Sequence, residues 1–385
     1  MNRITIVIAL FAAAAVVAHD LPAAQGGMPA LSSEPFKLGT FEIRGAPRVG
    51  LVLRDSLVIE LNPANAALEQ SPLYPRIPMP ADMRGLIAQY EYGLKYRLYE
   101  IVNHLAAGDR LAAGSRPEFV HDAARVRALP PIIYPGKILN AAGNFYSHIN
   151  ETGTPEEIAA TKRARREKRG VPYLFLKPAE GAVIGQGDAI VIPHGRDRTD
   201  WEVELATVIG RPAKYVSAAA AQDYVFGYMV SLDISDRGGR PPGGNPVASD
   251  WFVGKGHDTF APMGPWIVPK EFYGDPMAKL RQTLSVGGTR MQEATAGDMI
   301  HSIWELIEYA SSIITLFPGD VINNGTSGGT GAGTAFRGEQ RFLKPGEEIV
   351  ATIDGIGTLR LPVVGEAAPP AGTGARLPPV NSYRK

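Results

Sequence analysis

The residues with the clearest chemical potential are two glutamates in the segment Asp200-Trp201-Glu202-Val203-Glu204-Leu205-Ala206. Side chains alternate across a strand, so Glu202 and Glu204 project from one face while Val203 projects from the other. Two carboxylates held about 7 Å apart on one face repel each other. That face is therefore either open to water or holds a cation between the carboxylates, and both interpretations stay open at this point.

A third carboxylate, Asp233, directly follows the run from Tyr224 to Leu232, which has the pattern of a buried strand. An aspartate in such a place requires a hydrogen-bonding or ionic partner. Three carboxylates without a histidine pair or a thiol favour a hard, oxygen-preferring divalent ion such as magnesium, calcium or manganese, and zinc fits poorly.

His148 and Glu151 form a second candidate constellation. On a helix or turn, a spacing of three residues puts the carboxylate beside the imidazole, where it can orient the ring and raise its basicity toward a bound water. Surface His/Glu pairs with this spacing are also common, so the spacing alone does not choose between a catalytic and a structural pair.

The stretch from Asn324 to Gly333 contains five glycines. No lysine follows them as a phosphate-binding loop requires, and no helical pattern follows them as a dinucleotide fingerprint requires. We therefore expect a loop whose glycines let the backbone approach a small ligand.

These residues need a scaffold, and the pattern between 136 and about 365 is dominated by strands and turns. We predict strands at 137–142, 173–176, 189–193, 202–209, 224–231, 265–268, 321–323 and 348–353. Before them, 36–60 alternates like an antiparallel meander and 83–107 has helical spacing. A proline-rich connection at 130–136 separates a small, mostly β N-terminal domain (36–132) from a larger domain (136–366).

Two helices are predicted within the larger domain. One, at about 155–168, is strongly basic at its end and has no apolar face, so it cannot be a core helix and is either a solvated spacer or a mobile lid. The other begins at an N-cap, Asp298, carries an apolar stripe and ends before Pro318. We expect it to pack on the sheet.

Composition narrows the function classes. The chain has 385 residues with 43 Gly and 32 Pro, which disfavours long helical bundles and coiled coils. Lys plus Arg and Asp plus Glu both number 39, so the charge excess typical of a general nucleic-acid binder is missing. Cysteine is absent, which excludes disulfides, thiolate metal sites and a cysteine nucleophile.

The N-terminus has the pattern of a secretory signal peptide (1–18). Arg3 precedes an apolar run from Ile4 to Ala18 with small residues before His19. The run is shorter than the ~20 residues of a spanning helix, so we expect an exported product, periplasmic or secreted, without stable membrane insertion. An uncleaved anchor is the alternative. Residues 19–35 are predicted to form a flexible leader and 367–385 a disordered tail.

Taken in order, the motifs from about 138 to 366 resemble those of the fumarylacetoacetate hydrolase family. The matching segments are Asn144-Phe145-Tyr146-Ser147-His148, Phe175-Leu176-Lys177-Pro178, Glu202-Val203-Glu204-Leu205, Asp233-Ile234-Ser235, Lys255-Gly256-His257-Asp258, Gln292, Pro318-Gly319-Asp320 and Asp354-Gly355-Ile356-Gly357.

The resemblance implies an α+β fold, mainly β, in which a mixed β-roll forms the catalytic domain. It implies a homodimer and one divalent cation, Mg²⁺ or alternatively Mn²⁺ or Ca²⁺, bound by Glu202, Glu204 and Asp233. Family members act on 1,3-dicarbonyl or 2-oxo acids, cleaving a carbon–carbon bond with water or catalysing decarboxylation, isomerisation or hydration.

The resemblance also implies roles for individual residues. His148, oriented by Glu151, would be the general base, and Lys255 would stabilise a developing oxyanion or enolate. The substrate-binding residues are predicted to be Arg237, Thr326, Lys177 and Arg240. The basic helix falls where family members carry a closing lid.

Three positions depart from the family pattern. Asp236 stands where a small residue is common, Arg240 where glutamine is usual, and Ser327 where proline is common. The substrate therefore cannot be transferred. We expect a hydrolase of acylpyruvate-like acids; the alternatives are a decarboxylase, isomerase or hydratase of unsaturated 2-oxo acids, and a metal-dependent oxo-acid binder without turnover.

Overall fold

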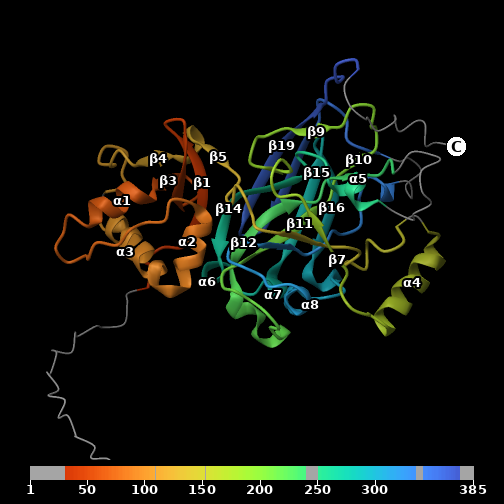
Figure 1. The fold of residues 1–385 in the computed structure, drawn as a ribbon, viewed down its shortest axis with the longest axis horizontal. Coiled ribbons are helices and arrows are strands. Elements are labelled where there is room, and N and C mark those ends of the chain that lie inside the picture. Colours follow the sequence, from red (N-terminus) through yellow and green to blue (C-terminus); the bar gives the residue numbers. More distant parts are fainter. Residues whose placement is uncertain (1–30, 109, 152, 240–249, 335–340, 373–385) are drawn as a thin grey trace, which may run out of the picture.

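The computed structural model describes residues 31–108, 110–151, 153–239, 250–334 and 341–372 (Figure 1). The predicted signal peptide, most of the leader and tail, and Arg240 lie outside the described residues. Within the described part, no helix combines the length and apolar character needed to cross a membrane.

A twelve-stranded mixed sheet forms the centre of the molecule. Along its main path the strands run in the order β4 (Val120–Asp122), β3 (Leu57–Glu60), β2 (Ala46–Leu53), β1 (Phe36–Ile43), β14 (Ala261–Pro269), β12 (Val225–Leu232), β11 (Val203–Ile209), β17 (Val321–Asn323), β6 (Ile138–Ala141) and β7 (Leu174–Lys177). Two short strands join off this path: β5 (Arg127–Leu129) pairs with β1, and β8 (Val183–Ile184) pairs with β14.

A five-stranded sheet packs on one face of the central strands and closes the roll. Its order is β16 (Thr289–Thr295), β15 (Arg281–Val286), β18 (Glu348–Ile353), β19 (Gly357–Gly365) and β9 (Ile190–Ile192). A separate two-stranded ladder joins β10 (Thr199–Asp200) to β13 (Ser235–Asp236). Mixed sheets with few helices confirm the predicted fold class.

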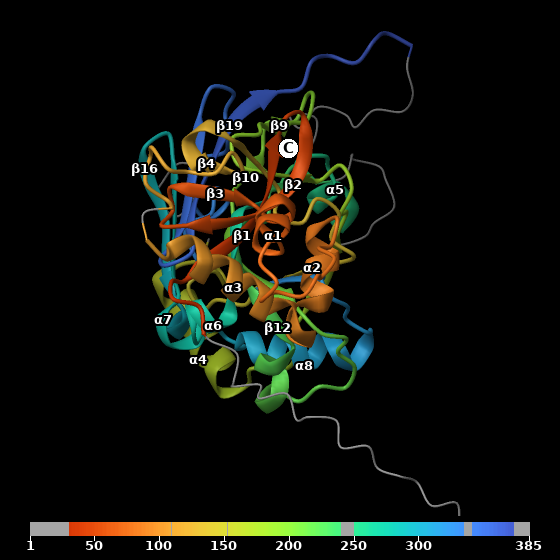
Figure 2. The ribbon, with the colours of Figure 1, turned by 90° about the vertical axis from the view of Figure 1, so that its left-hand side faces the viewer.

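The central strands β11 and β12 are buried on both faces. Leu205 and Leu232 belong to the core beneath the five-stranded sheet. Val208 and Phe226 face the opposite core, which is covered by α1 (Leu61–Leu68), α2 (Met83–Gln89) and α3 (Lys95–Ala106). Figure 2 shows these three helices in front of the sheets. Burial on both faces explains why these strands are almost continuously apolar in sequence.

The predicted helix at 83–107 is confirmed, with a break. Helices α2 and α3 are joined by a π-helical turn at Tyr90–Leu94, in which Gly93 has a φ of 117°. Glycine adopts this conformation without steric cost. In the same turn, the Tyr90 ring lies edge-on to Phe226, 4.9 Å between centroids, and so ties the helices to the central sheet.

The N-terminal strands extend the same sheet that carries the central strands. Strand β1 runs antiparallel to β14, with Leu38 opposite Ile267. The proline-rich connection at 130–136 does separate the two sets of elements in the chain, but their sheet is continuous.

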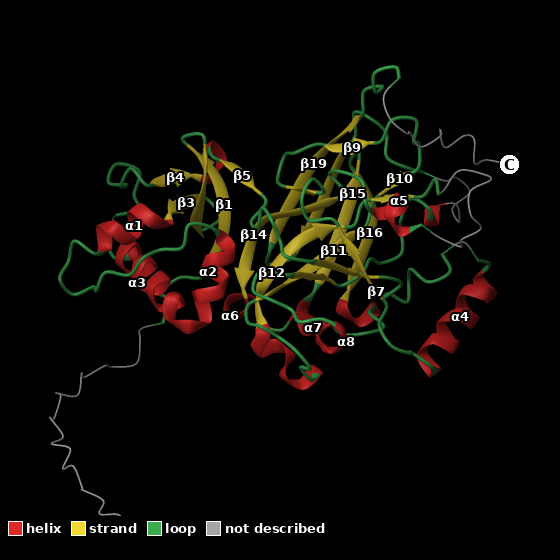
Figure 3. Ribbon diagram, viewed as in Figure 1, coloured by secondary structure: helices red, strands yellow, loops and turns green. Residues whose placement is uncertain are grey.

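The remaining helices lie around the sheets (Figure 3). They are α4 (Pro155–Glu167), α5 (Trp251–Lys255), α6 (Lys270–Tyr273), α7 (Pro276–Lys279) and α8 (Ile303–Ile313). As predicted, α4 buries none of its residues; it begins with a capping box made by Thr154 and Glu157.

The predicted start of the apolar helix at Asp298 is wrong. Helix α8 begins after Ser302, whose hydroxyl accepts from the backbone amide of Glu305, while the Glu305 carboxylate accepts from the backbone amide of Ser302. This reciprocal pair satisfies two helix donors at once. Asp298 instead ends a short 3-10 turn (Ala296–Asp298) and accepts hydrogen bonds from Ser147.

Candidate metal centre and active site

Three carboxylates meet at one end of the β11–β12 pair. Glu202 precedes β11, Glu204 lies within it and Asp233 follows β12, with the Asp233 amide donating to the Glu202 carbonyl at 3.0 Å. One oxygen from each side chain lies within 4.8 Å of the others, and all three residues are buried. The expectation that Glu202 and Glu204 share a face is confirmed.

Two of these carboxylates are paired with cationic side chains. Lys255 contacts Glu202 at 3.1 Å and Asp233 at 2.6 Å. Arg237 contacts Glu202 as well. Burial would raise the pKa of Glu202, but Lys255 and Arg237 outweigh it and hold this pKa at about 2. Conversely, burial acts to lower the pKa of Lys255, and Asp233 and Glu202 raise it above its usual value.

Glu204 has no such partner among the described residues. Its side chain accepts a backbone hydrogen bond from Gly325 at 2.9 Å. Burial, followed by repulsion from Asp233 and Glu202, raises its pKa well above the ordinary range. The centre therefore presents one uncompensated carboxylate beside two others, an all-oxygen donor set that fits a hard divalent cation.

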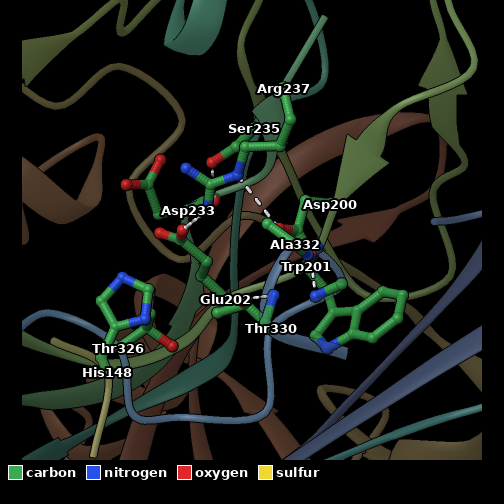
Figure 4. Close-up of polar contacts among 12 residues, drawn as sticks. His148, Asp200, Trp201, Glu202, Asp233, Ser235, Arg237, Thr326, Thr330 and Ala332 are labelled. Carbon is green, nitrogen blue, oxygen red and sulfur yellow. Dashed lines mark hydrogen bonds and ion pairs between the residues drawn. The ribbon is translucent and has the colours of Figure 1, made fainter. Parts of the chain in front are cut away.

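The His148–Glu151 pair lies in the turns between β6 and α4, beside this centre. Glu151 contacts His148 Nδ1 and also accepts from the Gly329 amide at 2.8 Å and the Thr330 hydroxyl at 3.2 Å. Three partners hold the carboxylate in place, so an Nδ1–H directed at Glu151 leaves Nε2 as the basic nitrogen. Figure 4 shows His148 and Thr326 beside the Glu202 and Asp233 side chains.

The glycine-rich loop at 324–333 passes close to Glu151, and glycine suits two of its positions. A Cβ on Gly329 would lie 2.1 Å from the Met291 carbonyl oxygen, and one on Gly333 would lie 1.8 Å from Glu151. A side chain at position 329 would collide with backbone, and one at position 333 would displace the Glu151 carboxylate. The glycine-rich stretch thus brings backbone against Glu151 and against the backbone of Met291.

Sequence reasoning missed Asp200. This fully buried carboxylate accepts from the Trp201, Gly331 and Ala332 amides at 2.8, 2.5 and 3.1 Å and from Arg237 Nε at 3.0 Å (Figure 4). It therefore links the glycine loop to Arg237. The signal was its place at the head of the segment that carries Glu202 and Glu204, two residues before Glu202.

Thr326 and Lys177, predicted to bind substrate, have clear protein partners. The Thr326 hydroxyl accepts from Gln292 at 2.8 Å and donates to the Val203 carbonyl at 3.2 Å. Lys177 is fully buried and donates to Asp233 and to the Ile234 carbonyl. Its pKa falls to about 8, chiefly through burial, against the opposing attraction of Asp233. Both positions support the centre, and their substrate contacts stay predictions.

Asp236, one of the departures from the family pattern, forms a buried ion pair. Arg196 Nε contacts it at 2.5 Å, and neither side chain is exposed. His257 lies 3.4 Å from the same carboxylate, and the Gly238 amide donates to it at 2.8 Å. The charge at 236 is thus satisfied beside Arg237. Arg240 lies outside the described residues.

Together these groups can bind a small anionic molecule at a cation, supply a base and stabilise negative charge. The three carboxylates could hold a cation, His148 could take a proton, and Lys255 and Arg237 place positive charge beside them. This combination suits the polarisation of a carbonyl compound and the transfer of a proton beside it.

The sequence comparisons identify a family whose model spans the residues of this site. The family model described as fumarylacetoacetate (FAA) hydrolase C-terminal matches residues 137–364. A 2,4-didehydro-3-deoxy-L-rhamnonate hydrolase from Sphingomonas sp. (strain SKA58) is 36% identical over 225 residues, which are 58% of this chain and 72% of that protein.

Two solved structures are similar over most of the chain. One is maleylpyruvate hydrolase from Sphingobium sp. SYK-6 in complex with manganese (II) and pyruvate, and the other is 5-carboxymethyl-2-hydroxymuconate delta-isomerase from Mycobacterium smegmatis. Each has a TM-score of 0.58 and 27% identity, and each alignment covers 86% of this chain and all of the other.

Proposed function

Because the chain belongs to the fumarylacetoacetate hydrolase family, we propose that it is a divalent-metal-dependent hydrolase that cleaves a carbon–carbon bond in acylpyruvate-like 2-oxo acids. The observation that supports this most directly is the meeting of the carboxylates Glu202, Glu204 and Asp233 with the His148–Glu151 pair. A site of this kind joins substrate chelation to water activation.

Glu202, Glu204 and Asp233 would hold the cation, and Mg²⁺ or Mn²⁺ fits their oxygen donors better than a soft metal does. The manganese (II) ion in the similar maleylpyruvate hydrolase supports this assignment. When bound, such an ion polarises the oxygens of a 2-oxo acid and lowers the energy of its enolate.

The chain's own residues would carry the proton and the charge. His148 Nε2 takes a proton from water as the water oxygen bonds to the distal carbonyl carbon, and Glu151 stabilises the resulting imidazolium. The carbon–carbon bond then breaks, its electron pair forms the enolate of the departing oxo acid, and a proton completes that product. Lys255 offsets the charge that develops, and Arg237 binds the substrate carboxylate.

The test is turnover of acetylpyruvate by the purified chain with Mn²⁺ or Mg²⁺, followed as loss of enol absorbance with product identification. We expect acetate and pyruvate, no reaction after chelation, and no turnover by His148→Ala, which should still bind the metal. A His148→Ala variant with full activity would refute the mechanism, and metal and acid binding without turnover by the unmodified chain would favour a binding protein.

Isomerisation is the second candidate, because the delta-isomerase matches the chain as closely as the hydrolase does. The same base and cation would move a proton between two carbons of an unsaturated 2-oxo acid without adding water. Incubation with such an acid distinguishes the two: a shifted absorbance without pyruvate release indicates an isomerase.

Export and dimerisation are part of the proposal. Residues 1–18 support export, which cell fractionation and the mass of the mature N-terminus would test. Homodimerisation rests on the family resemblance, and light scattering coupled to size exclusion would test it.

A further inference from the structure

A cavity of about 310 Å³ lies between α4 and the glycine-rich loop. It is lined by Ser147, Glu151, Ile158, Lys162, Gly328, Gly329, Gly333 and Thr334. The lining includes the carboxylate that holds His148, so the cavity adjoins the proposed reaction centre. Its volume suits the end of a small acid, at the lower limit of ordinary ligand pockets.

Lys162 is the cationic residue of this lining. It is half-buried, and among the described residues its ammonium group forms no ion pair. Ile158 lies one helical turn before it and supplies an apolar wall. A lysine free to donate beside an apolar wall suits a carbon chain that ends in an anionic group.

Glu151 does not cancel this preference. Its carboxylate already contacts His148, the Gly329 amide and the Thr330 hydroxyl. The amide of Gly328 is likewise occupied by the Ser147 hydroxyl at 2.8 Å. Lys162 is therefore the lining group that retains hydrogen-bonding capacity toward a ligand.

Contacts at the C-terminal end of α4 fix the helix, and with it Lys162, beside the cavity. The Arg166 guanidinium lies 5.0 Å from the centre of the Tyr146 ring. Arg169, just after the helix, donates to the Ile300 carbonyl at 3.0 Å and pairs with Glu305 at 2.5 Å. These contacts account for part of the helix's positive charge and leave Lys162 for the cavity.

We infer that Lys162 recognises a carboxylate at the distal end of the substrate, so the preferred oxo acid carries a second acidic group. This inference rests on the proposed function, since it places the 2-oxo acid end at the carboxylate centre. The substrate would extend past the His148–Glu151 pair, with its middle carbons against Ile158 and its distal carboxylate on Lys162.

The experiment compares two acylpyruvates that differ at the distal end, acetylpyruvate with a methyl group and fumarylpyruvate with a carboxylate. We expect the unmodified enzyme to have the lower KM for the diacid. Lys162→Met should raise that KM about tenfold, the effect of losing one charge-assisted hydrogen bond, with little change for acetylpyruvate. Lys162→Arg should retain the preference.

Arg163→Met is the matched control, because Arg163 is an exposed neighbour on the same helix that does not line the cavity. Equal KM values for both acids, or a Lys162→Met variant with unchanged selectivity, would overturn the inference while turnover of acetylpyruvate upheld the proposed function. Failure of the unmodified enzyme on both acids would instead refute the proposed function, and this inference with it.

Discussion

Glu204 differs from the two carboxylates beside it. Asp233 is paired with Lys255 and Lys177, and Glu202 is paired with Lys255 and Arg237. Among the residues that the structure describes, the Glu204 side chain has only the Gly325 amide as a partner. A divalent cation would supply the charge that is missing there. This residue is thus the one whose ionisation should depend most on the metal.

Glu204→Gln tests this dependence, because glutamine keeps the shape and removes the charge. We expect the affinity for Mn²⁺, measured by calorimetry, to fall on the order of tenfold or more. Glu348→Gln, on an exposed strand position, is the control. Unchanged affinity in the Glu204 variant would exclude it as a ligand.

Asp200 joins Arg237 to the glycine-rich loop. It accepts from Arg237 Nε and from the Gly331 amide, which follows Thr330 in that loop. Asp200→Asn should lower kcat/KM by roughly 10- to 100-fold, the value of a buried charged hydrogen bond of about 1.5–3 kcal/mol, while Mn²⁺ affinity stays near that of the unmodified chain. The effect should shrink when Arg237→Lys is already present. If the kcat/KM losses of Asp200→Asn and Arg237→Lys were fully additive, Asp200 would not act through Arg237.

The sequence predicted the carboxylate centre well, because strand alternation alone places Glu202 and Glu204 together and Asp233 ends the neighbouring strand. It could not predict the partners of each charge. That Lys177 lies behind Asp233, or that Asp200 binds Gly331 and Ala332, depends on loops that meet only in the folded chain.

At the scale of elements, we predict that the junction between α4 and α8 responds to pH through His301. His301 is buried at the start of α8, and burial lowers its pKa below 6.5, with Arg169 and Arg165 adding to the effect and Glu305 opposing it. The unfolded chain therefore takes up this proton at a higher pH than the folded chain does.

The lowered pKa of His301 predicts how the free energy of unfolding depends on pH. The contribution of neutral His301 is complete above about pH 6.5 and is lost as the pH falls, by up to about 1.4 kcal/mol of unfolding free energy per pH unit. Urea unfolding at pH 7.5 and 5.5 should show a smaller loss for His301→Gln than for the unmodified chain. An equal loss in both would mean that His301 titrates normally in the fold.

Element types were predictable because apolar periodicity is local, whereas helix starts depended on competing caps. Both Asp298 and Ser302 are N-cap residues by type, and the capping box with Glu305 decided between them. The break falls at Gly93, whose φ of 117° departs from the helix, and the neighbouring Tyr90 packs on Phe226, a contact between residues far apart in the sequence.

At the scale of the molecule, the N-terminal segment covers one face of the catalytic sheet. Phe226, Met229 and Ile267 share a core with α2 and α3, and Tyr90 and Tyr99 donate to Glu271 at 2.5 and 2.8 Å. Apolar burial of this extent makes the two parts interdependent.

Removal of residues 36–132 should therefore leave an aggregation-prone product, and the full chain should unfold in a single calorimetric transition. Two measurements test this: the soluble yield of the truncated chain relative to the full chain, and the calorimetric thermogram of the full chain. A soluble, metal-binding product of the truncation, or two resolved transitions in the full chain, would show that the parts fold independently.

The glycine loop has a consequence for how this enzyme can diversify. One wall of the site is backbone: an added carbon would collide with main-chain oxygens at Gly329 and Gly331 and would displace the Glu151 carboxylate at Gly333. The opposite wall is an exposed helix with Ile158 and Lys162 facing the cavity. Substitutions in the helix can therefore change the substrate range, whereas substitutions at the loop glycines should disrupt the site. A library randomised at positions 158 and 162 should yield active variants with altered preferences, and one randomised at 329, 331 and 333 should yield mostly inactive chains.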